Sequence, residues 1–265
     1  MNFRPLHRPL AVLPPLLVLA ALLWPLVYAL WMSFTPQELL EPPRGEWSLR
    51  WYREFFTQTR WTDSLGNSLG IGIGAAALSV IAGGGAAVAV VRHRFRGRRW
   101  LQGAVLLPLF IPALILGIAL LPVMRSLGLW GTHFSVAAAH SLWGLPLVFL
   151  SVRGALEDAD PQLELAARGM GASAAQTFRL VTLPLIAPGV AVGAMMAFII
   201  SLNELVMALF LCTAATDTLP KVIWPNLRYT LSPLVAATSS ITVLATLLLL
   251  AVAAWVGRKI SQPHL

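Results

Sequence analysis

Six long apolar segments, separated by polar ones, constrain this chain of 265 residues more than any other feature. A helix needs about 20 apolar residues to cross a bilayer, whereas a strand needs only about 10. Each segment is too long for a strand, and lipid offers no partner to free backbone groups, so helices are expected. The sequence therefore predicts an all-α membrane protein with a single transmembrane domain over residues 1–265 and six transmembrane helices. These helices cover about residues 11–34, 64–91, 100–124, 133–152, 186–212 and 235–256.

The composition agrees with a chain embedded in lipid. Hydrophobic residues make up 57% and charged residues only 11%, which lies outside the usual balance of a soluble domain. The first segment is too long for the apolar core of a signal peptide, and no small-x-small cleavage site follows it, so we expect a retained helix. The single cysteine, Cys212, excludes an internal disulfide and cannot alone form a metal site.

The positive charges predict the orientation. The short connection from Arg92 to Arg99 carries five arginines, and such connections lie on the cytoplasmic side of bacterial membrane proteins. If the N-terminus is cytoplasmic, twelve of the 19 Lys and Arg residues lie inside and seven lie outside. We therefore predict that both termini are cytoplasmic. Binding to nucleic acid is the other use of a basic run, and its place between two membrane helices argues against that use.

Glycines recur on one face of the second predicted helix, at Gly66, Gly70 and Gly74. Small residues at a spacing of four let helix backbones approach closely in lipid, so we expect these glycines to pack against another helix. A phosphate-binding loop is the alternative, but it requires a lysine after the glycines. The only lysines are Lys221 and Lys259, neither in that context. Any ATP that drives this protein must therefore be bound by a partner.

A polar, helix-like segment over residues 157–184 separates the fourth and fifth apolar segments. Asp160 and Pro161 suit the start of a helix, and Gly171 with Ser173 is expected to break the chain and start it again. An ordinary connection between two membrane helices needs no helices of its own. We expect this segment to be a docking site for a soluble partner; an amphipathic helix lying on the lipid headgroups is the alternative.

The segment resembles the coupling loop of ATP-binding-cassette (ABC) importer permeases, which reads Glu-Ala-Ala, three residues, Gly, nine residues, Ile, one residue, Leu-Pro. Its alanines fall on Ala166 and Ala167, its glycine on Gly171, and its last pair on Leu183-Pro184, with every spacing kept. Leu165 stands where the glutamate belongs, and the sequence leaves open whether the neighbouring Glu164 replaces it. The resemblance implies a cytoplasmic coupling helix that contacts an ABC ATPase dimer through Glu164, Ala166, Ala167, Arg168, Gly171, Leu183 and Pro184.

The resemblance covers about residues 10–258 and extends to one branch of these permeases. Ser201-Leu202-Asn203-Glu204-Leu205 resembles the corresponding motif of permeases for spermidine and putrescine, which reads closer to Ser-Phe-Asp-Glu-Phe. It implies a non-catalytic subunit of the bacterial inner membrane that carries a polyamine or a related small organic cation. The implied partners are the ATPase dimer, which binds ATP and magnesium, a second permease, identical or homologous, and a periplasmic binding protein. Because Asn203 replaces an aspartate, another small solute such as an aminophosphonate remains open.

Glu204 is the only carboxylate inside a predicted membrane helix. An ionised side chain at the centre of a membrane helix costs about 2.5–3.5 kcal/mol and usually faces a cavity or a partner. We expect Ser201, Asn203 and Glu204 to line the substrate pathway. A purely structural role is the alternative, with Glu204 hydrogen-bonded to Asn67 or Ser141 or reaching the outer boundary of the membrane.

Other chemistries find little support in the sequence. His133 and His140 share a helix face, but no acid or cysteine at metal-binding spacing accompanies them, so hydrogen-bonded packing histidines are expected. No serine-hydrolase or zinc-protease motif occurs, and no catalytic residue is predicted. A secondary transporter that works without ATP usually shows internal repeats or several intramembrane charges, and neither is found.

Overall fold

The computed structural model describes residues 8–260, and side chains from Val12 to Ala251. All regular structure in this part of the chain is helical. The described residues divide into two compact units. One unit runs to Thr62 and adds Ile223–Ala245, and the other consists of Asp63–Val222 with the residues from Thr246 onward. Arg4, one of the twelve positive residues counted on the inner side, lies outside the described residues.

The first unit contains α1 (Arg8–Met32), α2 (Arg50–Thr57) and the first part of α13 (Pro233–Ile260). The apolar side chains of α1 are mostly exposed, as a helix surrounded by lipid requires. Helix α2 is amphipathic, because Trp51 and Phe55 are buried and the charged side chains point outward.

The second apolar segment forms one helical run from Thr59 to Arg92. The run consists of α3 (Thr59–Ser79), the π-helical turn η2 (Val80–Gly84) and α4 (Gly85–Arg92). The wide turn lies where the helix contacts α7 (His133–Asp158) most closely. A Cβ atom at Gly83 would meet the carbonyl oxygen of Leu145 at 2.5 Å, so only glycine fits there.

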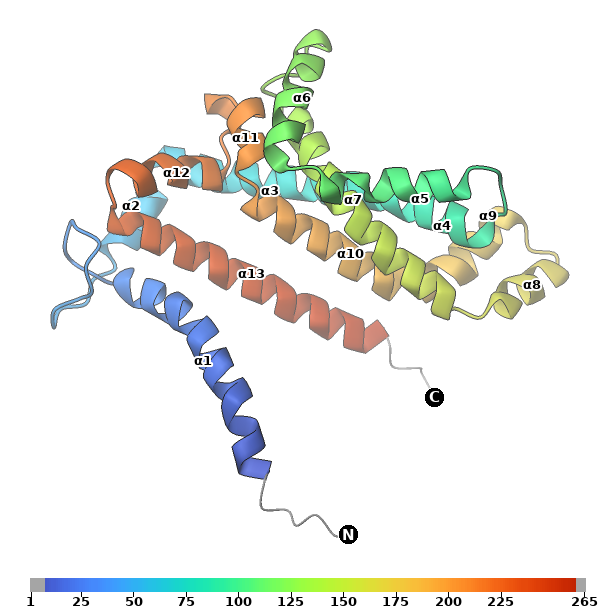
Figure 1. Cartoon of the computed structure of the whole chain (residues 1–265), viewed down its shortest axis with the longest axis horizontal. Coiled ribbons are helices and arrows are strands. Elements are labelled where there is room, and N and C mark those ends of the chain that lie inside the picture. The colour runs from blue at the N-terminus through green and yellow to red at the C-terminus, as the bar shows by residue number, and fades with distance from the viewer. Residues whose placement is uncertain (1–7, 261–265) are drawn as a thin grey trace. The chain divides into compact units, whose positions relative to one another are not determined.

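The third apolar segment differs from the prediction of one helix over residues 100–124. Helix α5 (Arg98–Leu106) continues into the 3₁₀ turn η3 (Leu107–Phe110), and α6 (Ala113–Ser126) then leaves at an angle of 108° (Figure 1). Pro112 explains the break, because a proline disfavours helical geometry in the residue before it, and Ile111 is extended. The described residues therefore contain five straight candidate membrane helices, or six when this bent pair is counted as one.

The fifth apolar segment also has other boundaries than the predicted 186–212. A helical run begins at Ala174 with α9 (Ala174–Thr177) and the π-helical turn η4 (Phe178–Thr182), and continues as α10 (Leu183–Asn203). The chain then breaks at Glu204-Leu205 and resumes as the short α11 (Val206–Leu211). The run starts early because the sequence after Ser173 is a good helix start, and it ends early for a reason described with the site below. The following connection contains η5 (Ala214–Thr216) and α12 (Leu219–Tyr229), so it is ordered without being one helix.

Helices α7 and α10 lie side by side and form the centre of the second unit (Figure 1). Glycines, among them Gly144 and Gly193, make this close approach possible. A Cβ atom at Gly144 would meet the hydroxyl of Ser79 and lie 2.7 Å from the Cβ of Ala197, and one at Gly193 would lie 2.9 Å from the Cα of Val148. The predicted stripe of glycines at Gly66, Gly70 and Gly74 packs less closely. Gly74 lies close to Ala137, but Cβ atoms at Gly66 and Gly70 would meet no described atom within 4 Å, so a packing role for these two glycines stays a prediction.

Replacing Gly144 with valine is expected to lower the unfolding temperature of the detergent-purified protein. The new side chain would force α7 and α10 apart, and overpacking of this kind costs about 1–3 kcal/mol. Gly154→Val is the matched control on the same helix, because a Cβ atom at Gly154 meets nothing within 4 Å. Equal unfolding temperatures for the two variants would contradict the packing described for Gly144.

Candidate functional site

The break between α10 and α11 is held by the carboxylate of Glu204. The first N–H groups of a helix have no partner within the helix. Here the carboxylate accepts hydrogen bonds from the backbone N–H groups of Val206, Met207 and Ala208 at 2.9 to 3.2 Å. The side chain is only 3% exposed. Glu204 therefore acts as the N-terminal cap of α11 inside an apolar environment.

His140 from α7 completes this cluster. Its ring is fully buried, and its Nδ1 lies 2.8 Å from the hydroxyl oxygen of Ser201. Its Nε2 lies 3.3 Å from a carboxylate oxygen of Glu204 but makes no hydrogen bond. The structural partners expected for Glu204 were therefore wrong: Asn67 contacts His133 at 2.8 Å, and Ser141 donates to the carbonyl of Ala138. The prediction of a hydrogen-bonded packing histidine is confirmed for His140, whereas its place beside Glu204 was not predicted.

The three predicted pathway residues do not share one surface. Ser201 and Glu204 are buried and are brought together by His140. Asn203 is exposed, and its amide donates to the carbonyl of Ile199 one turn earlier in its own helix. Of the three, only Asn203 presents its side chain to a molecule outside the chain in this conformation.

The segment over residues 157–184 contains two helices joined by a tight turn. Helix α8 (Pro161–Gly169) starts with the cap expected from the sequence, because the side chain of Asp160 accepts from the N–H of Gln162 at 2.9 Å. Gly171 has a φ of +90°, which favours glycine, and Ser173 forms a capping box with Gln176 at the start of α9. The expected break and restart at Gly171 and Ser173 are confirmed.

The side chains of this segment divide into an inner and an outer set. Ala167 is buried at 7% exposed, and Glu164 points inward to Arg92. Beside them lies a pocket of about 420 Å³ lined by residues that include His93, Arg168 and Thr177. Leu165, at the position of the family's glutamate, is 58% exposed. The exposed residues of the segment include Leu165, Ala166, Arg168, Met170, Leu183 and Pro184, of which Leu165 and Arg168 also line the pocket.

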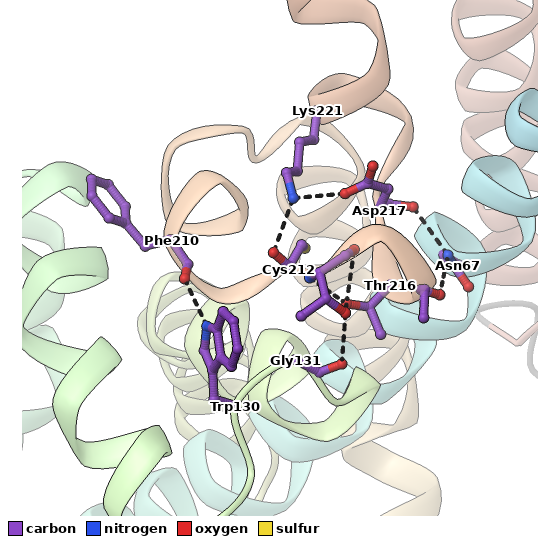
Figure 2. A network of polar contacts seen from close by, with 10 residues as sticks. Asn67, Trp130, Gly131, Phe210, Cys212, Thr216, Asp217 and Lys221 are labelled. Carbon is purple, nitrogen blue, oxygen red and sulfur yellow. Dashed lines mark hydrogen bonds and ion pairs between the residues drawn. The ribbon is translucent and has the colours of Figure 1, made fainter.

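At the other end of the unit, a polar network fixes the connection after α11 (Figure 2). The ammonium of Lys221 lies 2.6 Å from Asp217 and donates to the carbonyl of Cys212 at 2.9 Å. The side-chain amide of Asn67, on α3, donates to the carbonyls of Ala215 and Asp217 at 3.1 Å each. The network ties this connection to α3 and to the end of α11.

Comparison with known proteins identifies the family. A family model described as the inner membrane component of binding-protein-dependent transport systems matches residues 77–262. The putrescine transport system permease protein PotI of Escherichia coli is 32% identical over 260 residues, covering 95% of this chain and 90% of that protein.

Two further proteins show how far the similarity reaches. The trehalose transport system permease protein SugB of Mycobacterium tuberculosis is 36% identical, but over 173 residues, 65% of this chain and 63% of that protein. Among solved structures, a bacterial ABC transporter involved in the import of the polysaccharide alginate has a TM-score of 0.73 at 19% identity. It covers 96% of this chain and 98% of its own, so the fold is shared. This chain belongs to the binding-protein-dependent permeases of the inner membrane, the non-catalytic transmembrane subunits of ABC importers, in which a separate subunit hydrolyses ATP.

Proposed function

We propose that this permease imports a small organic cation of the polyamine class, with putrescine or spermidine as its substrate. The observation that carries the proposal is the similarity to a putrescine permease over 95% of the chain. The buried carboxylate of Glu204 supports it, because a negative charge in a medium of low dielectric constant attracts a cation over a longer range than in water. Asn203, next to it in the chain and exposed, is then the side chain that contacts the substrate.

The orientation and the partners form part of the same proposal. Arg92 contacts Glu164, so the arginine-rich connection and α8 lie at the same end of the unit. The excess of positive charge in that connection supports a cytoplasmic location for both, and for both termini. The cytoplasmic ATPase dimer then docks on α8 and α9. A second permease completes the pathway, and the periplasmic binding protein delivers substrate to the opposite end, where the Lys221–Asp217 network fixes the connection.

Another small solute is the second candidate, and one observation favours it. The trehalose permease is more similar to this chain over the part that the two share, at 36% identity. The missing second acid at Asn203 points the same way, and an aminophosphonate would fit as well. Transport without ATP has no comparable support, because the chain belongs to a family of binding-protein-dependent systems.

Uptake of labelled putrescine into proteoliposomes tests the substrate. The complete complex, with its ATPase and binding protein, is reconstituted with ATP or with a non-hydrolysable ATP analogue on the ATPase side. We expect uptake only with ATP, and we expect unlabelled spermidine, but not unlabelled trehalose, to compete. Competition by trehalose and not by spermidine would indicate that the substrate is a sugar and not a polyamine. Uptake that is equal with the analogue would contradict the proposal of an ATP-driven importer.

A further inference from the structure

The carboxylate of Glu204 is matched at the opposite end of the unit by a second inward-facing acid, Glu164. One of its oxygens lies 3.0 Å from the Nε of Arg92 and accepts a hydrogen bond from the hydroxyl of Thr182, also at 3.0 Å. The side chains of Arg92 and Glu164 are only 17% and 15% exposed. This three-residue contact is called the Arg92–Glu164–Thr182 bridge below.

The bridge joins three elements, one of which is far from the other two in the sequence. Glu164 lies in α8, Arg92 is the last residue of α4 and so ends the second membrane run, and Thr182 lies in η4, directly before α10. Arg92 and Glu164 are 72 residues apart. One carboxylate of α8 therefore contacts the ends of two membrane helices.

The bridge also explains how this chain departs from its family's motif. The motif glutamate is replaced by Leu165, which faces outward, while the acid has moved one position, to Glu164, and faces inward. On a helix, neighbouring positions point about 100° apart, so the two side chains cannot serve the same contact. The carboxylate of Glu164 contacts Arg92 and Thr182 of the same chain, so it is not available to a partner in this conformation.

Loss of this acid would affect more than one hydrogen bond. The Nη2 atom of Arg92 is buried and has no hydrogen-bond partner among the described residues. Without Glu164, the guanidinium would keep its charge in a largely buried place with no counter-charge in contact. Breaking one side of such a pair costs more than the pair contributes when it is intact.

We propose that the Arg92–Glu164–Thr182 bridge is the element that couples the ATPase to the membrane helices in this permease, and that Arg92 and Glu164 are positioning residues for that step. The inference rests on the proposed docking of the ATPase at α8. In this proposal, the internal ion pair connects α8 rigidly to α4 and α10. Without it, movement of α8 would not reach these membrane helices.

A reciprocal charge exchange tests the bridge. Complexes with Glu164→Gln, Arg92→Gln, or Arg92→Glu combined with Glu164→Arg are purified and reconstituted. Two quantities are measured: the ATP hydrolysis of the ATPase that co-purifies with each permease, and the putrescine taken up per ATP hydrolysed. We expect each single variant to lower the uptake per ATP about tenfold, within the usual range of coupling free energies, and the exchange to restore most of it.

Two further comparisons make the result decisive. Arg153→Gln is the matched control, because it removes an ion pair of similar length, 2.8 Å to Glu157, that lies within a single helix. It should leave both quantities at the wild-type value. If the single variants lose the ATPase itself, its return in the exchange variant supports the bridge in the same way.

The proposed coupling role of the bridge is overturned if the single variants equal the wild type in both quantities. It is also overturned if the exchange variant takes up no more putrescine per ATP than the single variants do. Failure of the wild-type complex to retain any ATPase would instead refute the proposed docking. Failure of the wild type to take up putrescine would refute only the proposed substrate, and the uptake per ATP would then be measured with labelled trehalose, the sugar named by the second candidate.

Discussion

Replacing Glu204 with glutamine is expected to lower uptake by about tenfold or more and also to lower the unfolding temperature of the protein. The glutamine amide keeps one oxygen acceptor, but its NH₂ group would face backbone N–H groups that now donate to the carboxylate. A hydrogen bond to a charged group contributes about 1.5–3 kcal/mol, and 1.4 kcal/mol corresponds to a factor of ten. The measurement is uptake by the reconstituted complex together with thermal unfolding in detergent.

The unfolding temperature separates the two roles that Glu204 could have. If Glu204 mainly caps α11, stability and maximal uptake fall together. If it is mainly a substrate ligand, the putrescine concentration for half-maximal uptake rises while the unfolding temperature stays the same, and that outcome would contradict the capping role. Asn203→Ala is the control, because this exposed residue bonds only to its own helix. It should leave stability unchanged.

His140 should be energetically coupled to Glu204. A histidine-to-alanine change leaves the hydroxyl of Ser201 without its partner and opens a space beside the carboxylate. Residues in one network give non-additive effects, so the double variant His140→Ala with Glu204→Gln should cost less than the sum of the two single variants. Additive changes in unfolding free energy would show that the histidine and the acid act independently.

The membrane helices were predictable because they follow from length and polarity alone. The two internal breaks were not equally visible. Pro112 is a local signal for the bend between α5 and α6, and its meaning was available in the sequence. The break after Asn203 has no proline or glycine; it exists because Glu204 offers its carboxylate to the N–H groups of the next helix. A hydropathy pattern shows only that such an acid is unfavourable within a membrane helix. It does not show that the acid caps the next helix.

The contacts that build the candidate sites depend on residues distant in the sequence. His140 meets Ser201 across 61 residues, and Arg92 meets Glu164 across 72. Which face of a helix packs on which neighbour decides such pairs, and a single sequence does not contain that information. The glycines show the same limit. Cβ atoms at Gly66 and Gly70, in the regular stripe, would meet nothing within 4 Å among the described residues, whereas the isolated Gly144 and Gly193 allow close helix contacts. Local signals, such as Asp160 before Pro161, were sufficient wherever the structure depends on nearby residues.

Replacing Gly171 with valine is expected to remove most of the ATPase from the purified complex and, with it, ATP-driven uptake. A φ of +90° is rarely adopted by residues with a side chain, and a left-handed conformation costs an L-residue about 1–2 kcal/mol, more when the residue is β-branched. The turn between α8 and α9 would open, and the outward-facing residues of α8 would no longer be held in one arrangement. Co-purification of the ATPase at one-to-one stoichiometry with the permease is the measurement.

Gly169→Val isolates the effect of the turn from that of added bulk. Gly169 ends α8 two residues earlier, has no positive φ, and a Cβ atom there meets nothing within 4 Å. Ala167→Phe acts from the inner side, since Ala167 is 7% exposed and a phenyl ring would push α8 outward. We expect both Gly171→Val and Ala167→Phe to lose the ATPase and Gly169→Val to keep it. If Gly171→Val keeps a full complement of ATPase, α8 and α9 are not the docking surface, and the partner must be sought on another part of the permease.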